Sequence, residues 1–191
     1  MESKIKDLQE LGFHGKYRLW ESYLRKYDCN IVAELGICEG KNFGTIIKSE
    51  PTLAIAIDVW KRDGTPSRND RDFTQEQLDE QYAHMKDVEV IYPFVKVYRE
   101  YTFEAVKHFP DEYFDFVYID ADHTYESVLR DIRDWYPKVK KGGTLVGDDY
   151  RVLTVPWTNT KFGVIEAVNQ FTKEMNLTFF QLPNYGWGII K

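Results

Sequence analysis

Two hydrophobic stretches of this sequence end abruptly in carboxylates, and these carboxylates are the side chains best suited to chemistry. Asp120 follows the stretch Phe114–Ile119, while Asp148 and Asp149 follow a second stretch at residues 144–146. Continuous runs of β-branched and aromatic residues are typical of strands buried on both faces of a parallel sheet. We therefore expect each set of carboxylates to lie at the end of a buried strand.

A helix is predicted between the two strands. Hydrophobic residues recur at helical spacing over residues 125–136, at Val128, Leu129, Ile132 and Trp135. A strand, a helix and a second strand with short links form a right-handed parallel crossover. Such a crossover brings the carboxyl ends of both strands to one edge of the sheet, where open α/β sheets bind their ligands.

The carboxylates at this edge predict a cation. Neighbouring strands lie roughly 5 Å apart, so Asp120, Asp148 and Asp149 would crowd one small site together with Asp122. Like charges at such distances destabilise each other unless a proton or a cation intervenes. A hard divalent cation with oxygen ligands is the natural neutraliser.

A second candidate site begins where the predicted strand Ile31–Leu35 runs into a turn that contains Gly36 and Gly40. Glycines let a ligand approach the backbone, and free N–H groups at a helix N-terminus attract an anion such as a carboxylate. The turn is thus a candidate ligand cradle. The alternative is an ordinary tight turn.

Asp58 ends a further predicted strand, residues 53–57, and lies 22 positions beyond Gly36. An acidic residue at this place suits a bidentate grip on the hydroxyls of a ribose. The alternative is a capping carboxylate or one that is solvated in a loop.

The remaining pattern predicts a single α/β domain. An amphipathic helix is expected within residues 19–27, in a segment that otherwise lacks strand signals. The other expected elements are a loop at 61–73, a helix at 73–85 with Thr74 as N-cap, a strand at 95–98 in preference to 88–91, a helix at 102–109, a Lys-Lys-Gly-Gly turn at 140–143, a segment at 151–161 with break points at Pro156 and Asn159, a helix at 162–175, and a terminal hairpin of 177–182 and 187–190 with an antiparallel last strand.

Composition narrows the class of protein. The 191 residues carry a formal net charge of -6 without a basic stripe, which argues against nucleic acid as a partner. Cys29 and Cys38 form no ligand or disulfide framework, which favours a reducing, cytoplasmic location. An apolar signal core and a run of 18 apolar residues are both missing from the sequence, so we expect no membrane partner.

Taken together, these motifs resemble those of the class I S-adenosylmethionine-dependent methyltransferases. The resemblance lies in Glu34-Leu35-Gly36 with Gly40, in Asp58, and in the Lys-Lys-Gly-Gly lead-in to a strand. More narrowly, IDADH at residues 119–123 and GDDY at 147–150 are similar to motifs of metal-dependent small-molecule O-methyltransferases. These include the catechol type and the sugar O-methyltransferases of macrolide and aminocoumarin pathways.

The resemblance covers roughly residues 31–190 and implies a fold and a domain organisation. The implied fold is α/β and doubly wound, a mostly parallel seven-stranded sheet with an antiparallel last strand, the Rossmann-like methyltransferase fold. Residues 31–191 would form the methyltransferase domain. Residues 1–30 would be an N-terminal helical segment of the same domain.

The implied cofactors are S-adenosylmethionine and a divalent cation, with Mg²⁺ expected. By position, the implied donor contacts are Glu34, Gly36, Gly40, Asn42 and Asp120, with Asp58 on the ribose and Tyr101 and Thr102 at the adenine, although Glu100 stands where the family usually has glycine. The implied metal ligands are Asp120, Asp148 and Asp149.

His123 falls where the catechol-type enzymes have a basic catalytic residue and the sugar-modifying branch has a histidine. A histidine needs only a modest pKa to act as a general base on a hydroxyl that a metal has acidified. Asp122 could orient His123 or act as the base itself. Alternatively, Asp122 or Thr124 caps the helix that begins at Tyr125.

The predicted function is therefore divalent-metal-dependent O-methylation of a small hydroxylated molecule, such as a sugar or a polyphenol. An NAD(P)-dependent oxidoreductase is one alternative, although it expects G-x-G-x-x-G where this chain has Gly36 and Gly40 four positions apart. A catalytically silent module that binds the methyl donor is the other alternative. The sequence leaves a homo-oligomer open.

Overall fold

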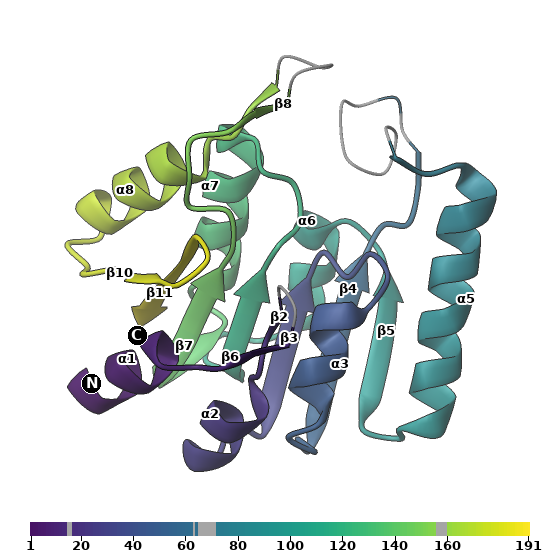
Figure 1. Cartoon of the computed structure of the whole chain (residues 1–191), viewed down its shortest axis with the longest axis horizontal. Coiled ribbons are helices and arrows are strands. Elements are labelled where there is room, and N and C mark those ends of the chain that lie inside the picture. The colour runs from purple at the N-terminus through teal and green to yellow at the C-terminus, as the bar shows by residue number, and fades with distance from the viewer. Residues whose placement is uncertain (15–16, 63, 65–71, 156–159) are drawn as a thin grey trace.

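Seven strands form one sheet at the centre of the folded molecule (Figure 1), in the order β10-β11-β7-β6-β3-β4-β5. The structure is a computed structural model that describes residues 1–14, 17–62, 64, 72–155 and 160–191. The strands are β3 (Ile31–Leu35), β4 (Leu53–Asp58), β5 (Val95–Arg99), β6 (Phe114–Ile119), β7 (Val139–Gly147), β10 (Phe180–Leu182) and β11 (Gly186–Ile190). Strands β5, β4, β3, β6 and β7 are parallel, and β11 is antiparallel to both β7 and β10. The predicted fold class is confirmed.

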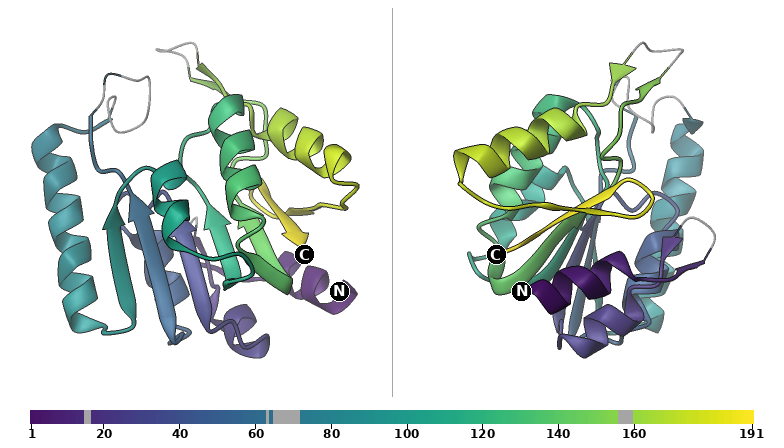
Figure 2. Two further views of the ribbon diagram at one scale, coloured as in Figure 1. Left: turned by 180° about the vertical axis from the view of Figure 1, so that it is seen from behind. Right: turned by 60° about the vertical axis from the view of Figure 1, so that its left-hand side comes forward.

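Helices cover both faces of the sheet (Figure 2). One face carries α1 (Glu2–Gln9), α2 (Glu21–Lys26), α3 (Lys41–Ile47) and α5 (Gln75–Ile91), and the other carries α6 (Thr102–Ala105), the short helix η1 (Val106–His108), α7 (Tyr125–Trp135) and α8 (Val164–Glu174). Each face has its own hydrophobic core. Along β4, Ala54 and Ala56 belong to the core beneath α1, α2, α3 and α5, while Ile55 and Ile57 belong to the core beneath α6, α7 and α8. Because successive strand residues point to opposite faces, a doubly covered strand must be apolar throughout.

The N-terminal segment packs on the sheet through α1, α2 and a short hairpin. The hairpin joins β1 (Phe13–His14) to β2 (Tyr17–Arg18), so the expectation of no strand in this segment is wrong. Strands of two residues are too short to leave a period-two pattern in the sequence. In α2, the hydroxyl of Tyr23 lies 2.7 Å from Thr144 Oγ1 of β7. The division of the chain at residue 30 stays a prediction.

Helix α5 begins as predicted but ends later. Thr74 and Gln77 form a capping box at its start, which confirms the predicted N-cap. The helix continues to Ile91, and the C-cap residue Tyr92 is extended because it precedes Pro93. Residues 88–91 are therefore helical. The preferred strand prediction, residues 95–98, is confirmed by β5 (Val95–Arg99).

The predicted turn at residues 140–143 is wrong, because these residues lie within β7. The backbone at Gly142 and Gly143 forms hydrogen bonds with Lys191, just beyond β11, at 2.8 and 3.0 Å. Hydrogen bonds to the C-terminal end of the chain therefore hold this stretch in β7, although Gly142 has φ +78°. The ladder between β6 and β7 is irregular between Phe114 and Phe116, next to the same stretch.

Parts of two predicted segments fall outside the described residues. Most of the loop at 61–73 does so, as do the break points Pro156 and Asn159. The described flanks of the latter pair as strands β8 (Thr154–Val155) and β9 (Thr160–Lys161). Of the helices in the described part of the chain, none combines the length and hydrophobicity needed to cross a membrane.

Gly36 and Gly44 should respond in opposite ways to replacement by Ala. Gly36 has φ +85°, and a Cβ there would lie 2.1 Å from the carbonyl oxygen of Asp120. Gly36→Ala should therefore lower the free energy of unfolding by about 3 kcal/mol or more, through backbone strain and overpacking. Gly44 lies inside α3, and a Cβ there would meet nothing within 4 Å. Gly44→Ala should raise the free energy of unfolding by about 0.5–1 kcal/mol.

Urea unfolding of both variants beside the wild type checks this prediction. If Gly36→Ala were as stable as Gly44→Ala, the backbone at Gly36 could not lie as close to Asp120 as the structure places it.

Candidate active site

The parallel topology gathers the ends of four strands at the upper edge of the sheet in Figure 1. The glycine turn follows β3, and Asp58 ends β4. Asp120 follows β6, and Asp148 and Asp149 follow β7. This is the carboxyl edge at which open α/β sheets bind their ligands.

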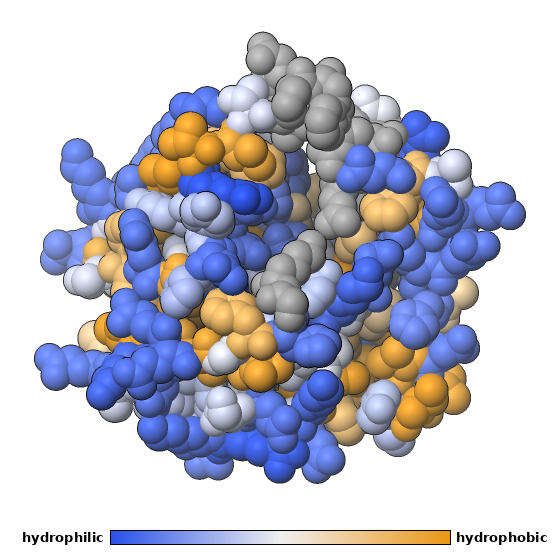
Figure 3. Space-filling view, viewed as in Figure 1, coloured by the Kyte–Doolittle hydropathy of each residue, from blue (hydrophilic) through white to orange (hydrophobic). Residues whose placement is uncertain are grey.

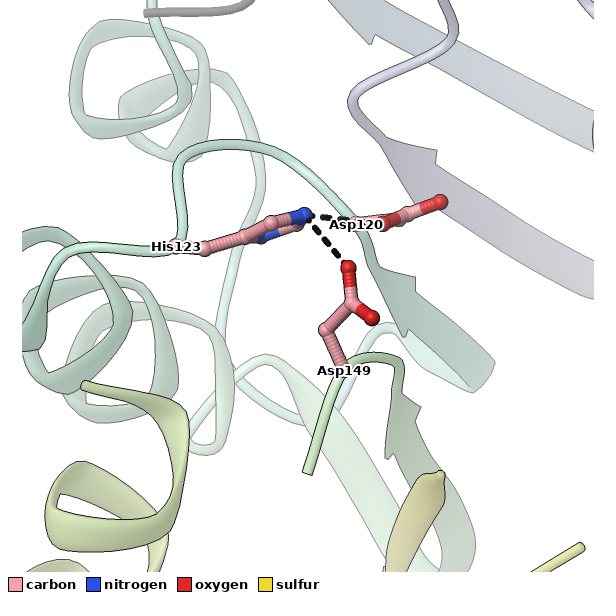
Figure 4. Close-up of side chains that lie close together, drawn as sticks. All are labelled: Asp120, His123 and Asp149. Atoms are coloured by element: carbon pink, nitrogen blue, oxygen red, sulfur yellow. Dashed lines mark ion pairs between the residues drawn. The ribbon is translucent and has the colours of Figure 1, made fainter. Parts of the chain in front are cut away.

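His123 lies between two carboxylates at this edge (Figure 4). Its Nε2 is 3.0 Å from Asp149 Oδ2 and 3.7 Å from Asp120 Oδ1. One ligand atom from each of the three side chains lies within 4.8 Å of the others. All three side chains are partly buried. Two carboxylates and an imidazole in this arrangement could hold a divalent cation or, without one, form an ion-paired base.

The charges of the cluster favour a protonated imidazole. Burial tends to lower the pKa of His123, but the hydrogen bond to Asp149 and the charges of Asp120 and Asp149 outweigh it and raise the pKa. Burial likewise tends to raise the pKa of Asp149, but His123 and Arg151 outweigh it and lower the pKa. Arg151 Nη2 lies 2.6 Å from Asp149 Oδ1, so Asp149 is held between two cationic groups.

Asp148 is drawn away from the cluster by Arg18 of β2. Arg18 Nη1 lies 3.7 Å from Asp148 Oδ1, and Nη2 donates to the carbonyl oxygen of Pro183. Arg18 is only 3% exposed, so this partner is part of the core. The structure thus brings Asp120 and Asp149 together with His123, and it leaves Asp148 on a different partner. The role of Asp148 as a metal ligand stays a prediction.

Asp122 lies just before α7, whose N-cap residue is Thr124. Its carboxylate accepts hydrogen bonds from the backbone N–H and the hydroxyl of Thr124, at 3.1 and 3.0 Å, and from Ser127 Oγ at 2.8 Å. The Asp122 carboxylate is thus engaged with side chains at the start of α7, but neither Asp122 nor Thr124 forms the predicted side-chain cap. These contacts do not test whether Asp122 also orients His123.

Asp58 organises the glycine turn. Its Oδ2 accepts from the backbone N–H groups of Ile37 and Cys38 at 2.9 and 2.8 Å, and its Oδ1 accepts from that of Trp60 at 3.0 Å. The indole of Trp60 in turn donates to the carbonyl oxygen of Cys38 at 3.0 Å. The predicted ribose contact stays a prediction. The sequence pattern did not point to Trp60, which fastens the same turn from the other side.

Glu34 and Asn42 flank the turn with unsatisfied polar atoms. Among the described residues, neither Glu34 Oε2 nor Asn42 Nδ2 has a hydrogen-bond partner, and both atoms are buried. Burial and then the charge of Asp120 raise the pKa of Glu34, while a side-chain interaction with the Asn42 amide opposes the shift, so the two side chains lie close together. A buried acceptor and a buried donor beside a glycine turn fit the ammonium and carboxylate groups of an amino acid, such as the methionine part of S-adenosylmethionine.

Thr102 and Tyr101, the predicted adenine contacts, lie at the start of α6. The hydroxyl of Thr102 donates to Asp131 Oδ1 of α7 at 2.6 Å. Tyr101 stacks on Phe103, with ring centroids 5.2 Å apart. The adenine contacts stay a prediction, and the Thr102 hydroxyl is already bound to α7.

Replacing Asp131 by Asn should make stability less dependent on pH. Burial raises the pKa of Asp131 to about 7, and the hydrogen bond from Thr102 opposes the shift. In the unfolded chain Asp131 ionises near the ordinary pKa of about 4, so the free energy of unfolding should fall by about 4 kcal/mol as pH rises from there to 7. Asp131→Asn should remove this fall and stabilise the protein at pH 8 but not at pH 4.

Urea unfolding at both pH values checks this prediction. Asp134→Asn is the matched control, because it removes the same charge from a partly exposed position of the same helix. Parallel pH profiles for the wild type and Asp131→Asn would contradict the expectation.

A small pocket adjoins the cluster. The residues that line it come from β6, α7, α8, β11 and the loops after β6 and β7: Ile119, Ala121, Asp122, His123, Val128, Asp148, Val164 and Trp187. Its space is no larger than about one water molecule, so the pocket by itself identifies no ligand. In Figure 3, most of the described surface of this view is hydrophilic, with a hydrophobic area over the C-terminal end of α5, where Val90 and Ile91 are exposed.

Comparison with known proteins identifies the class. Residues 33–150 match a family model described as a methyltransferase domain. The match spans more than half of the chain, and the chain belongs to this family of class I methyltransferases. The prediction of a methyltransferase is confirmed. No curated protein matches the sequence.

Solved structures of similar fold include several O-methyltransferases. The O-methyltransferase NovP is 13% identical with a TM-score of 0.61, over 98% of this chain and 79% of that chain. An O-methyltransferase from Bacillus cereus in complex with SAH is 13% identical with a TM-score of 0.63, over 100% and 90%. CalS11, a TDP-rhamnose 3'-O-methyltransferase, is 17% identical with a TM-score of 0.55, over 88% and 74%. At these identities the likeness establishes the shared fold.

Proposed function

We propose that this methyltransferase transfers a methyl group from S-adenosylmethionine to a hydroxyl of a small molecule, such as a sugar or a polyphenol. The observation that carries the proposal is the cluster of Asp120, His123 and Asp149 at the same sheet edge as the glycine turn. A base beside a donor site is what O-methylation requires. The descriptions of the similar structures as O-methyltransferases, one of them acting on TDP-rhamnose, are in keeping with this acceptor class.

The chemistry asks two things of the protein. Methyl transfer from a sulfonium is an in-line displacement whose reactivity resides in the cofactor, so the protein must orient the acceptor and remove its proton. In the proposed mechanism, Nε2–H of neutral His123 donates to Asp149, and the other ring nitrogen, Nδ1, accepts the hydroxyl proton. Asp149, at 3.0 Å, holds the ring in place and stabilises the imidazolium that forms.

The donor set of the cluster also fits a divalent cation. We propose that Asp120 and Asp149 bind this cation and that His123, beside them, is the base. Asp148 would become a third ligand only if its ion pair with Arg18 breaks. When bound, such a cation supplies a positive charge that lowers the pKa of the acceptor hydroxyl. Mg²⁺ is the first cation to test, since carboxylate oxygens are its preferred protein ligands.

Methyl transfer to a panel of acceptors tests the proposal. The protein is incubated with S-adenosylmethionine and with nucleotide sugars, free sugars or catechols, in Mg²⁺ and in EDTA. The expected result is the gain of one methyl group on a hydroxyl of at least one acceptor, faster in Mg²⁺. Donor binding without turnover on any acceptor would favour the silent module instead. Family membership argues against the NAD(P)-dependent oxidoreductase.

Three finer predictions belong to this proposal. We propose a cytoplasmic location, because neither Cys29 nor Cys38 takes part in a disulfide. A homo-oligomer is left open. The absence of nucleic acid and membrane partners also stays a prediction.

A further inference from the structure

The N-terminal segment contacts the donor side of the site through Trp20, which precedes α2. Trp20 is fully buried and packs against Phe116 and Tyr118 of β6, with ring centroids 5.1 and 5.3 Å apart. Its Nε1 donates a hydrogen bond to Asn42 Oδ1 at 3.0 Å. Trp20 lies outside the residues that match the family, 33–150.

This hydrogen bond fixes which way the Asn42 amide points. An indole N–H can only donate, so Asn42 must present its oxygen to Trp20. The amide nitrogen therefore faces away from Trp20. Asn42 is 8% exposed, and its Nδ2 has no hydrogen-bond partner in the described part of the chain.

Glu34 supplies the complementary group. It lies at the end of β3, is 1% exposed, and its Oε2 also lacks a partner within the described ranges. A buried polar group without a partner costs about 1–3 kcal/mol. The Asn42 side chain also interacts with Glu34 and opposes the rise of its pKa, so the two groups lie close together. A buried donor and a buried acceptor side by side at one glycine turn suit a ligand that carries both an anionic and a cationic group.

We propose that Trp20 is a positioning residue for the methyl donor, because it orients Asn42 so that the amide nitrogen and Glu34 together receive the amino-acid end of the donor. This inference rests on the proposed function. It assigns part of donor recognition to the segment before the matched family domain. Without the indole N–H, the amide of Asn42 can flip and present its oxygen to the donor carboxylate, which would repel it.

Trp20→Phe tests the proposal, because it keeps an aromatic ring and removes the N–H. Titration with S-adenosylhomocysteine should show a dissociation constant raised about tenfold, the effect expected of one lost hydrogen bond. Tyr23→Phe is the matched control: it removes a buried hydrogen bond made by the same segment, to Thr144 at 2.7 Å. Tyr23→Phe should change the dissociation constant less than about twofold, although both variants lower the unfolding temperature.

A double-mutant cycle separates positioning from general destabilisation. Trp20→Phe should add nothing to the loss caused by Asn42→Ala. Asn42→Asp gives a second test. It retains an oxygen for Trp20, removes the amide nitrogen and should weaken binding as well.

Equal effects of Trp20→Phe and Tyr23→Phe, additivity with Asn42→Ala, or wild-type affinity of Asn42→Asp would each overturn the role of Trp20. Failure of the wild type to bind S-adenosylhomocysteine would instead contradict the proposed function.

Discussion

Replacing Asp149 by Asn should slow methyl transfer by about 10³-fold, whereas the same replacement at the adjacent Asp148 should slow it less than about tenfold. Asp149 lies 3.0 Å from His123 and is a candidate cation ligand. Replacement by Asn therefore removes the negative charge that orients His123 and that would bind the cation. Asp148 instead faces Arg18, whose Nη1 lies 3.7 Å from Asp148 Oδ1. Steady-state kinetics of the two variants under identical conditions measures the difference.

The substitutions are chosen to leave the backbone unchanged. Asp149 has φ +58°, a left-handed conformation that Asn adopts more readily than most residues. Asp148→Asn leaves the buried Arg18 without its carboxylate, so we expect the free energy of unfolding to fall by about 2 kcal/mol, less than for a fully buried pair because Asp148 is partly exposed. One variant should thus lose activity and the other stability. If Asp148→Asn were as inactive as Asp149→Asn, Asp148 would be a metal ligand after all.

Replacing His123 by Gln should lower kcat by about 10²–10³-fold and leave the affinity for S-adenosylhomocysteine unchanged. The imidazole is the only titratable nitrogen in the cluster of candidate ligands among the described residues, and it is the proposed base. Because its pKa is raised above 6.5, turnover of the wild type should fall as pH drops through that raised pKa, where the base becomes protonated. The variant should lack this fall.

Rates measured from pH 5.5 to 9 check this prediction. His108→Gln is the matched control: it is the same substitution at an exposed histidine, paired with Glu100. Affinity for Mg²⁺ should survive His123→Gln if Asp120 and Asp149 suffice to hold the cation. An unchanged rate across the whole pH range would return His123 to a structural role, and lost Mg²⁺ affinity would make it a ligand.

The sheet could be predicted because its strands leave local signals. The core strand β3 has the predicted bounds, and β4 differs by only one residue, Asp58. Parallel strands covered on both faces are continuously apolar, and this pattern needs no knowledge of the partner strands. The placement of carboxylates at one sheet edge followed from the parallel direction of strands joined by a crossover helix.

The partners within the site could not be predicted, because they come from distant parts of the chain. Arg18 pairs with Asp148 from 130 positions away, and nothing near either residue indicates the other. Trp20 and Asn42 are likewise 22 positions apart. Short-range patterns report whether a residue is buried and which way it faces. The identity of its neighbour depends on how the N-terminal segment packs across the sheet.

The most direct test of the account is calorimetric titration of the protein with S-adenosylhomocysteine, first in EDTA and then in Mg²⁺. We predict binding in both buffers, together with a separate heat when Mg²⁺ is added that Asp149→Asn abolishes. Binding without any metal heat would leave a methyltransferase whose His123 acts without a cation. No binding in either buffer would contradict the central claim that the glycine turn, Glu34 and Asn42 form a methyl-donor site.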